Sequence, residues 1–125
     1  MKQSLALFLL CAVSMAAEVT GKWSGSFKAE GADHSISQWI ILTQHGSTLS
    51  GSAGPDASEQ YPLEDGKVNG NKVSFQVTTG EWRFSYNLTA EKDVLSGDLK
   101  LESTTENRNA RVTLTRVKTS KQTGE

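Results

Sequence analysis

Short runs of alternating apolar and polar residues follow one another along most of the chain, and turn signals separate them. No stretch shows the periodicity of an amphipathic helix, so the alternation predicts strands with one buried and one wet face. Asn69-Gly70-Asn71 lies between two such runs, and Asn-Gly is a strong hairpin signal. We therefore expect eight strands, which cover Val19–Ala29, Ser35–Gln44, Thr48–Ala53, Tyr61–Val68, Lys72–Thr79, Glu81–Thr89, Val94–Glu102 and Ala110–Val117.

Most connections between these runs are short, which favours antiparallel pairing of consecutive strands. Eight strands with one apolar face each must pack as two sheets or close on themselves, and closure also removes the exposed edges. Gly25, Gly51 and Gly97 fall in register with the apolar faces, as strongly coiled strands require. The sequence therefore favours an all-β, eight-stranded antiparallel up-and-down β-barrel over a β-sandwich.

Residues 1–17 predict a secretory signal peptide. Lys2 precedes an apolar run over residues 5–13, and small residues suited to a cleavage site follow at Ser14 and Ala16. That run is too short to anchor the chain in a bilayer. We expect an exported protein, periplasmic or secreted and without a membrane span in the mature chain, with a signal peptide at 1–17, a barrel domain at 18–117 and a disordered polar tail at 118–125.

The charge balance and the cysteine count exclude several classes of function. Thirteen basic residues against 14 acidic ones give a net charge of −1, which removes the electrostatic case for binding nucleic acid. The single cysteine, Cys11, lies in the signal peptide, so the mature barrel has no disulfide or thiolate. His34 and His45 lack metal-ligand spacing, and no G-x-S-x-G motif occurs. We expect no catalytic residue, no metal and no cofactor.

Several inward-facing residues form the candidate lumen, and Tyr86 would be its polar group because a buried hydroxyl needs a partner. In a roomy barrel these side chains would line a cavity for a small apolar molecule, whereas in a tight barrel they would fill the core. Both interpretations stay open. The candidate lumen residues are Phe27, Ile40, Leu42, Phe75, Phe84 and Tyr86.

The second strand is apolar on both faces at Trp39-Ile40-Ile41-Leu42. If Ile40 and Leu42 face inward, Trp39 and Ile41 point outward. Two adjacent apolar side chains on the outer surface form a larger patch than the single apolar residues that are common on protein surfaces. One interpretation is a protein contact, such as a homodimer interface. The other is that the N-terminal segment or a loop covers the two side chains.

Gly21-Lys22-Trp23 resembles the G-x-W signature of the calycin superfamily, which includes lipocalins and avidins. Thr113-Leu114-Thr115-Arg116 resembles the last-strand position whose arginine packs over the first-strand tryptophan in that superfamily. The resemblance implies that Trp23 and Arg116 stack and close one end of the barrel.

The outline also resembles small bacterial secreted proteins of unknown function, through Gln44–Gly51 (Gln-x-Gly-x-x-Leu-x-Gly) and Asp65–Val68 (Asp-Gly-x-Val). The resulting hypothesis is an exported binding module for a small hydrophobic ligand in the barrel lumen. The alternative is a protein-interaction or enzyme-inhibitor barrel with a filled core, which acts through Trp39 and Ile41 on its outer surface.

Overall fold

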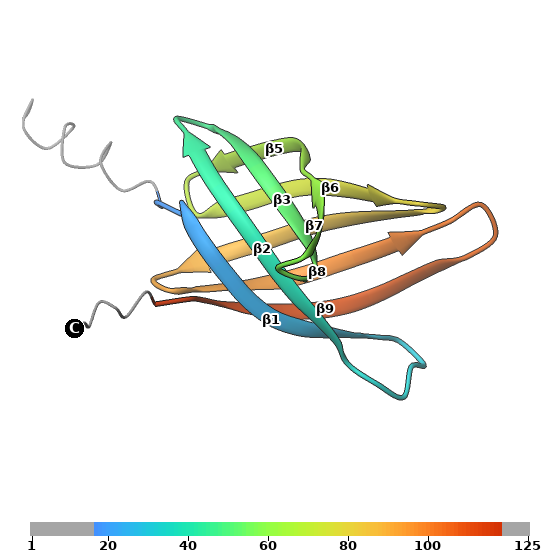
Figure 1. The fold of residues 1–125 in the computed structure, drawn as a ribbon. Coiled ribbons are helices and arrows are strands. Elements are labelled where there is room, and N and C mark those ends of the chain that lie inside the picture. Colours follow the sequence, from blue (N-terminus) through green and yellow to red (C-terminus); the bar gives the residue numbers. More distant parts are fainter. Residues whose placement is uncertain (1–16, 119–125) are drawn as a thin grey trace, which may run out of the picture.

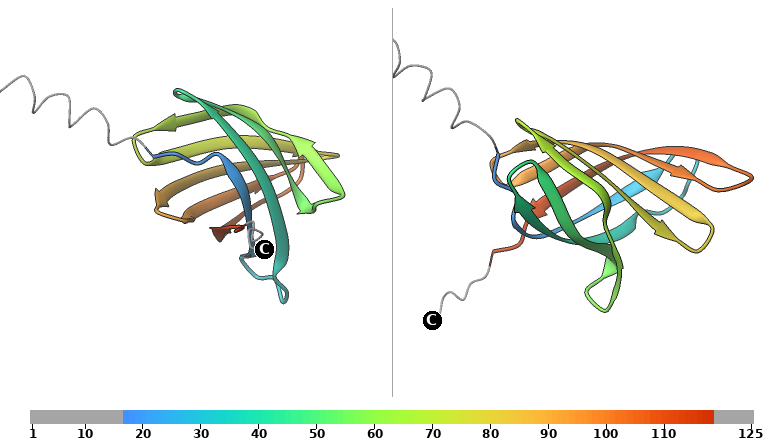
Figure 2. Two further views of the ribbon diagram at one scale, coloured as in Figure 1. Left: turned by 60° about the vertical axis from the view of Figure 1, so that its left-hand side comes forward. Right: turned by 90° about the horizontal axis from the view of Figure 1, so that it is seen from above.

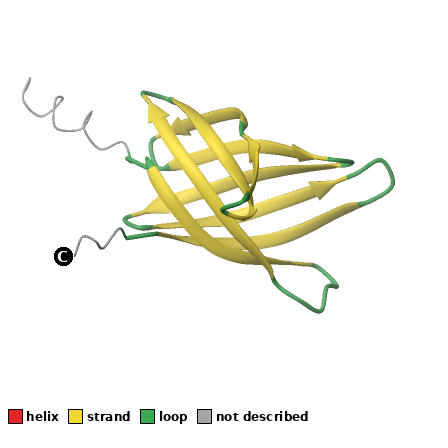
Figure 3. Cartoon of the chain, viewed as in Figure 1, coloured by secondary structure: helices red, strands yellow, loops and turns green. Residues whose placement is uncertain are grey.

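The computed structural model describes residues 17–118, which form strands and turns (Figure 3). No helix in this range is long and apolar enough to cross a membrane. The predicted signal peptide up to residue 16, and the predicted tail from residue 119, lie outside the described residues. The strands are β1 (Gly21–Ala29), β2 (Ile36–His45), β3 (Thr48–Asp56), β4 (Glu59–Pro62), β5 (Glu64–Asn69), β6 (Lys72–Thr79), β7 (Trp82–Glu91), β8 (Val94–Glu102) and β9 (Asn107–Arg116).

The strands close into an antiparallel barrel with up-and-down connections (Figure 1). The first and last strands pair from Trp23↔Arg116 to Ala29↔Ala110, which completes the ring. Both β4 and β5 pair with β3, so they form one strand that is interrupted at Leu63. The prediction of an all-β, eight-stranded up-and-down barrel is therefore confirmed.

Two glycines show how the turns and the coiling arise. Gly70, in the turn between β5 and β6, has a φ of 64°, the left-handed region that primed hairpin turns need. Gly25, in the middle of β1, lies so close to β9 that an added Cβ would be 2.0 Å from the carbonyl oxygen of Thr113. Only glycine permits this approach, which tightens the coiling of the barrel.

The apolar face of each strand points inward, and it fills one half of the barrel completely. The filled half contains the start of β1 and the end of β2, where Trp23 and Leu42 are buried. The largest side chains with almost no exposed surface are Trp23, Phe75, Ile40, Leu42, Leu88, Leu95, Leu99 and Leu114.

The two ends of the barrel differ (Figure 2). At the closed end, short turns accompany the first and last described residues. At the open end lie the longer loops before β2 and between β8 and β9, together with the connections from β3 to β4 and from β6 to β7. Ile36 has the inward parity that the alternation predicts, yet 47% of its surface is exposed because β2 begins at this open end.

Candidate functional site

The closed end is built around Trp23 and Arg116. The guanidinium of Arg116 lies 4.5 Å from the centre of the Trp23 ring, and the indole Nε1 donates a hydrogen bond to the carbonyl of Val19 at 2.9 Å. Arg116 also donates to the carbonyl oxygens of Glu18 and Thr20, at 3.0 and 2.6 Å. These contacts tie the segment before β1 across the end of the barrel.

Arg116 also donates from Nε to the carboxylate of Asp93, at 2.9 Å, and Lys118 reaches the second oxygen of the same carboxylate at 3.1 Å. The hydrogen bond from Arg116, followed by that from Lys118, holds the pKa of Asp93 below its ordinary value. The charge of Asp93 thus helps to orient the guanidinium over the indole.

Three of the six candidate lumen residues belong to the filled half. Ile40, Leu42 and Phe75 are almost fully buried among other core side chains. Phe75 stacks on Tyr86, with ring centres 4.5 Å apart. These three side chains belong to the packed core next to the cavity and do not border the cavity itself.

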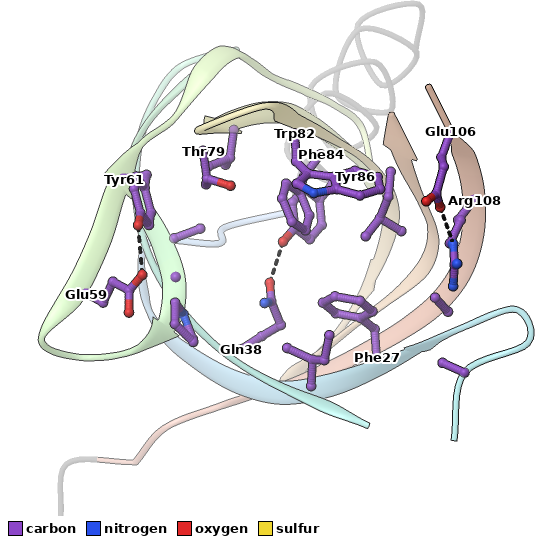
Figure 4. Close-up of a pocket in the computed structure, with 18 residues that line it drawn as sticks. Phe27, Gln38, Glu59, Tyr61, Thr79, Trp82, Phe84, Tyr86, Glu106 and Arg108 are labelled. Carbon is purple, nitrogen blue, oxygen red and sulfur yellow. Dashed lines mark hydrogen bonds and ion pairs between the residues drawn. The ribbon is translucent and has the colours of Figure 1, made fainter. Parts of the chain in front are cut away.

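The other three, Phe27, Phe84 and Tyr86, border a cavity of about 490 Å³ at the open end (Figure 4). The interior is therefore filled in one half and hollow in the other. The remaining residues around the cavity are Ala29, Ala32, Ile36, Gln38, Ala53, Gly54, Pro55, Glu59, Tyr61, Val77, Thr79, Trp82, Leu101, Glu106 and Arg108.

One strand supplies the aromatic wall. Because alternate residues of a strand share a face, Trp82, Phe84 and Tyr86 of β7 all point into the barrel. Tyr86 is buried at the floor, whereas Phe84 and Trp82 are half-buried nearer the rim. Phe27 meets Phe84 edge to face, with ring centres 6.3 Å apart. The wall offers flat apolar surface from floor to rim.

The floor carries one polar pair. The hydroxyl of Tyr86 donates a hydrogen bond to Oε1 of Gln38, and Nε2 of Gln38 donates to the carbonyl of Ser37 at 3.1 Å. Gln38 is 7% exposed and is the one buried polar or charged side chain among residues 17–118. Burial raises the pKa of Tyr86 above its ordinary value, so this floor is uncharged at neutral pH.

Within the described part of the chain, the charged side chains that border the cavity lie at its rim. The hydroxyl of Tyr61 donates to Glu59 at 2.7 Å, and Nε of Arg108 donates to Glu106 at 2.9 Å. All three charged residues are exposed to solvent. The cavity is thus apolar along its walls, neutral at its floor and charged at its mouth.

The barrel wall is incomplete beside the mouth. In the described chain β4 pairs with β3 alone, and the pairing between β5 and β6 extends no further than Glu64↔Gln76. The end of β6, from residue 77 to 79, therefore pairs only with β7. Tyr61 on one side and Thr79 on the other both border the cavity, so it reaches this seam between β4 and β6.

The two histidines lie at opposite ends of the barrel and do not form one site. His34 precedes β2 at the open end, whereas His45 is the last residue of β2 at the closed end, and both are exposed. Among residues 17–118 no group of three or more histidine, cysteine, aspartate or glutamate side chains could hold a metal ion.

Trp39 and Ile41 lie on the outer face of β2, each partly exposed. On one side Trp39 pairs with Gly54 of β3, which has no side chain to cover the indole. The side chain of Gln60 reaches across from β4 and donates to the carbonyl of Trp39 at 2.9 Å. The two apolar side chains thus form a small outer patch, separate from the cavity.

The sequence prediction of the lumen omitted Gln38, although its position signalled an inward direction. Gln38 shares the parity of Ile40 and Leu42, so its side chain had to enter the barrel. No family model, curated protein or solved structure matches this chain. The case for function therefore rests on the geometry of the cavity.

Proposed function

We propose that this chain is an exported barrel of the calycin type that binds one small, mainly apolar molecule in the cavity at its open end. The observation that carries the proposal is the cavity of about 490 Å³ with its aromatic wall, in a barrel whose other half is filled. Pockets of roughly 300–1,000 Å³ are typical of sites for single small molecules. The stack of Arg116 on Trp23 and the up-and-down closure support the calycin part of the proposal.

The apolar walls provide the driving force for binding. Each square ångström of apolar surface removed from water contributes about 25 cal/mol, and both the ligand and the side chains around it would lose such contact. The half-buried rings of Phe84 and Trp82 still have apolar surface that a ligand could cover. A flat aromatic or compact alicyclic molecule would suit this wall best.

Uptake of ethylnaphthalene, measured by its fluorescence, tests the proposal. Ala53 is buried and borders the cavity, so Ala53→Phe should fill the space and weaken uptake at least about tenfold. Leu95→Met, a volume-conserving change in the filled half, should leave uptake unchanged. Absence of uptake by the unmodified protein, or equal uptake by Ala53→Phe, would overturn the proposal. Native mass spectrometry of the purified protein is an independent measurement, because it reveals whether the protein carries a small molecule from the cell.

Export is tested separately. If residues 1–17 are a signal peptide, the protein recovered from outside the cytoplasm should have the mass of a chain that begins at Ala17 or Glu18. If the protein has the mass of the full-length chain and is found only in the cytoplasm, export is contradicted, but the binding proposal is not affected.

A second candidate function is a protein contact through the outer patch of Trp39 and Ile41. The observation in its favour is that both side chains remain partly exposed and that Trp39 lies opposite Gly54, which has no side chain. A homodimer held by this patch should become monomeric on Trp39→Lys, with no loss of fold, as measured by sedimentation. A protein that is already monomeric at high concentration would argue against the homodimer.

A further inference from the structure

The floor of the cavity has hydrogen-bonding capacity that the folded chain does not use. A glutamine amide carries two N–H donors and an oxygen with two acceptor positions. In Gln38 one donor serves the carbonyl of Ser37, and one acceptor position receives the hydroxyl of Tyr86. One donor and one acceptor position therefore remain on the same amide, beside the free lone pairs of the tyrosine oxygen.

This floor is stable without a ligand. No buried side-chain nitrogen or oxygen among residues 17–118 lacks a hydrogen-bond partner. Gln38 and Tyr86 satisfy each other, and Phe75 stacks beneath the tyrosine ring and fixes it in place. A ligand would thus meet a donor and an acceptor that are already held in position, which lowers the entropy cost of binding.

The floor also discriminates by charge. A carboxylate that enters an apolar site needs a cationic partner, because burial of an unpaired charge is costly. Among residues 17–118 the one cation that borders the cavity, Arg108, is exposed at the rim and already paired with Glu106. A neutral group that offers both a donor and an acceptor pairs with the floor without that cost.

We propose that the Gln38–Tyr86 pair selects ligands with an uncharged carboxamide or lactam head group, which enters first while the apolar body lies along the wall of β7. This inference rests on the proposed function and names the ligand class of the same cavity. It gives a role to the buried glutamine that stands between Ile36 and Ile40 on the inward face of β2.

Three probes of one shape test the inference: naphthylacetamide, naphthylacetate and ethylnaphthalene. Titration calorimetry on the intact protein should give a Kd for the amide at least about tenfold lower than for the carboxylate at neutral pH. Equal affinities for the two would overturn the inference. If ethylnaphthalene binds and naphthylacetamide binds no more tightly than ethylnaphthalene does, the inference fails but the proposed function stands. If no probe binds, the proposed function fails with it.

A double variant locates the selectivity. Gln38→Met with Tyr86→Phe removes both polar partners together, which leaves no buried group unsatisfied and preserves the volume of the floor. The amide should lose its advantage over ethylnaphthalene, while the Kd for ethylnaphthalene stays within about threefold of the original value. Thr113→Val is the control, because it removes a hydroxyl from the exposed face of β9, away from the cavity. Retention of the amide preference in the double variant, or its loss in Thr113→Val, would overturn the assignment to the floor.

Discussion

Asp93 gives the closed end a measurable pH dependence. Hydrogen bonds from Arg116 and Lys118 hold the pKa of Asp93 below its ordinary value of 3.8. Since the folded pKa is the lower one, the carboxylate stabilises the fold above the unfolded pKa, and this contribution disappears as the pH falls through the folded pKa. Asp93→Asn should therefore lower the Tm at neutral pH, and the difference from the unmodified protein should shrink as the pH falls below the ordinary pKa of 3.8 and through the lower folded pKa.

Thermal unfolding followed by circular dichroism between about pH 7 and pH 2 measures this difference. Asp98→Asn is the control, because Asp98 pairs with Arg111 on the surface with both side chains about three-quarters exposed. Such a pair contributes little, so its removal should hardly change the Tm. A deficit in Asp93→Asn that stays constant down to pH 2 would contradict the assignment.

At the residue scale, the sequence predicted part of the candidate site. Inward parity selected Phe27, Phe84 and Tyr86, which border the cavity, but it could not separate them from Ile40 and Phe75, which share the parity and lie in the filled half. The position of a residue in the alternation determines whether its side chain points into or out of the barrel. How far along the barrel axis the side chain lies depends on the stagger of the strands. That stagger appears only in the three-dimensional pairing.

At the scale of elements, the seam between β4 and β6 should be the weakest part of the wall. Because β4 pairs only with β3, its outer edge has no partner strand in the described structure. Amides of β4 and of residues 77–79 in β6 should exchange faster than those in the middle of β7 and β8, which are paired on both sides. Hydrogen exchange monitored by NMR checks this order. Equal protection across these strands would indicate that β4 and β6 pair in solution.

The alternation predicted the strands well, because a barrel needs one apolar face along each strand. It treated Tyr61–Val68 as one strand, however, whereas the structure breaks the strand at Leu63. Pro62 has no N–H to donate, and Asp65 has a φ of 53° beside a register shift between Glu64 and Lys67. A left-handed aspartate leaves no mark on the apolar pattern, so this bulge and the seam that follows from it were not predictable from alternation.

At the scale of the whole molecule, the barrel separates the two tasks of stability and binding. The closed end contains the stack of Trp23 and Arg116, and the open end contains the cavity, and the two share no side chain. Arg116→Met should cost about 2 kcal/mol in the free energy of unfolding, since it removes the cation–π contact and the bonds to two carbonyl oxygens. It should leave the Kd for ethylnaphthalene unchanged.

The double variant of Arg116→Met with Ala53→Phe makes this separation quantitative. Substitutions at sites without shared partners add, so the change in the free energy of unfolding should equal the sum of the two single changes within about 0.5 kcal/mol. Urea denaturation supplies these values, and titration with ethylnaphthalene supplies the affinities. Since the strands that hold Arg116 and Ala53 belong to one closed sheet, strain could pass between the ends through these strands and through the filled half that they enclose. A non-additive free energy, or a Kd altered by Arg116→Met, would therefore mean that the sheet or the filled half transmits a change from one end to the other.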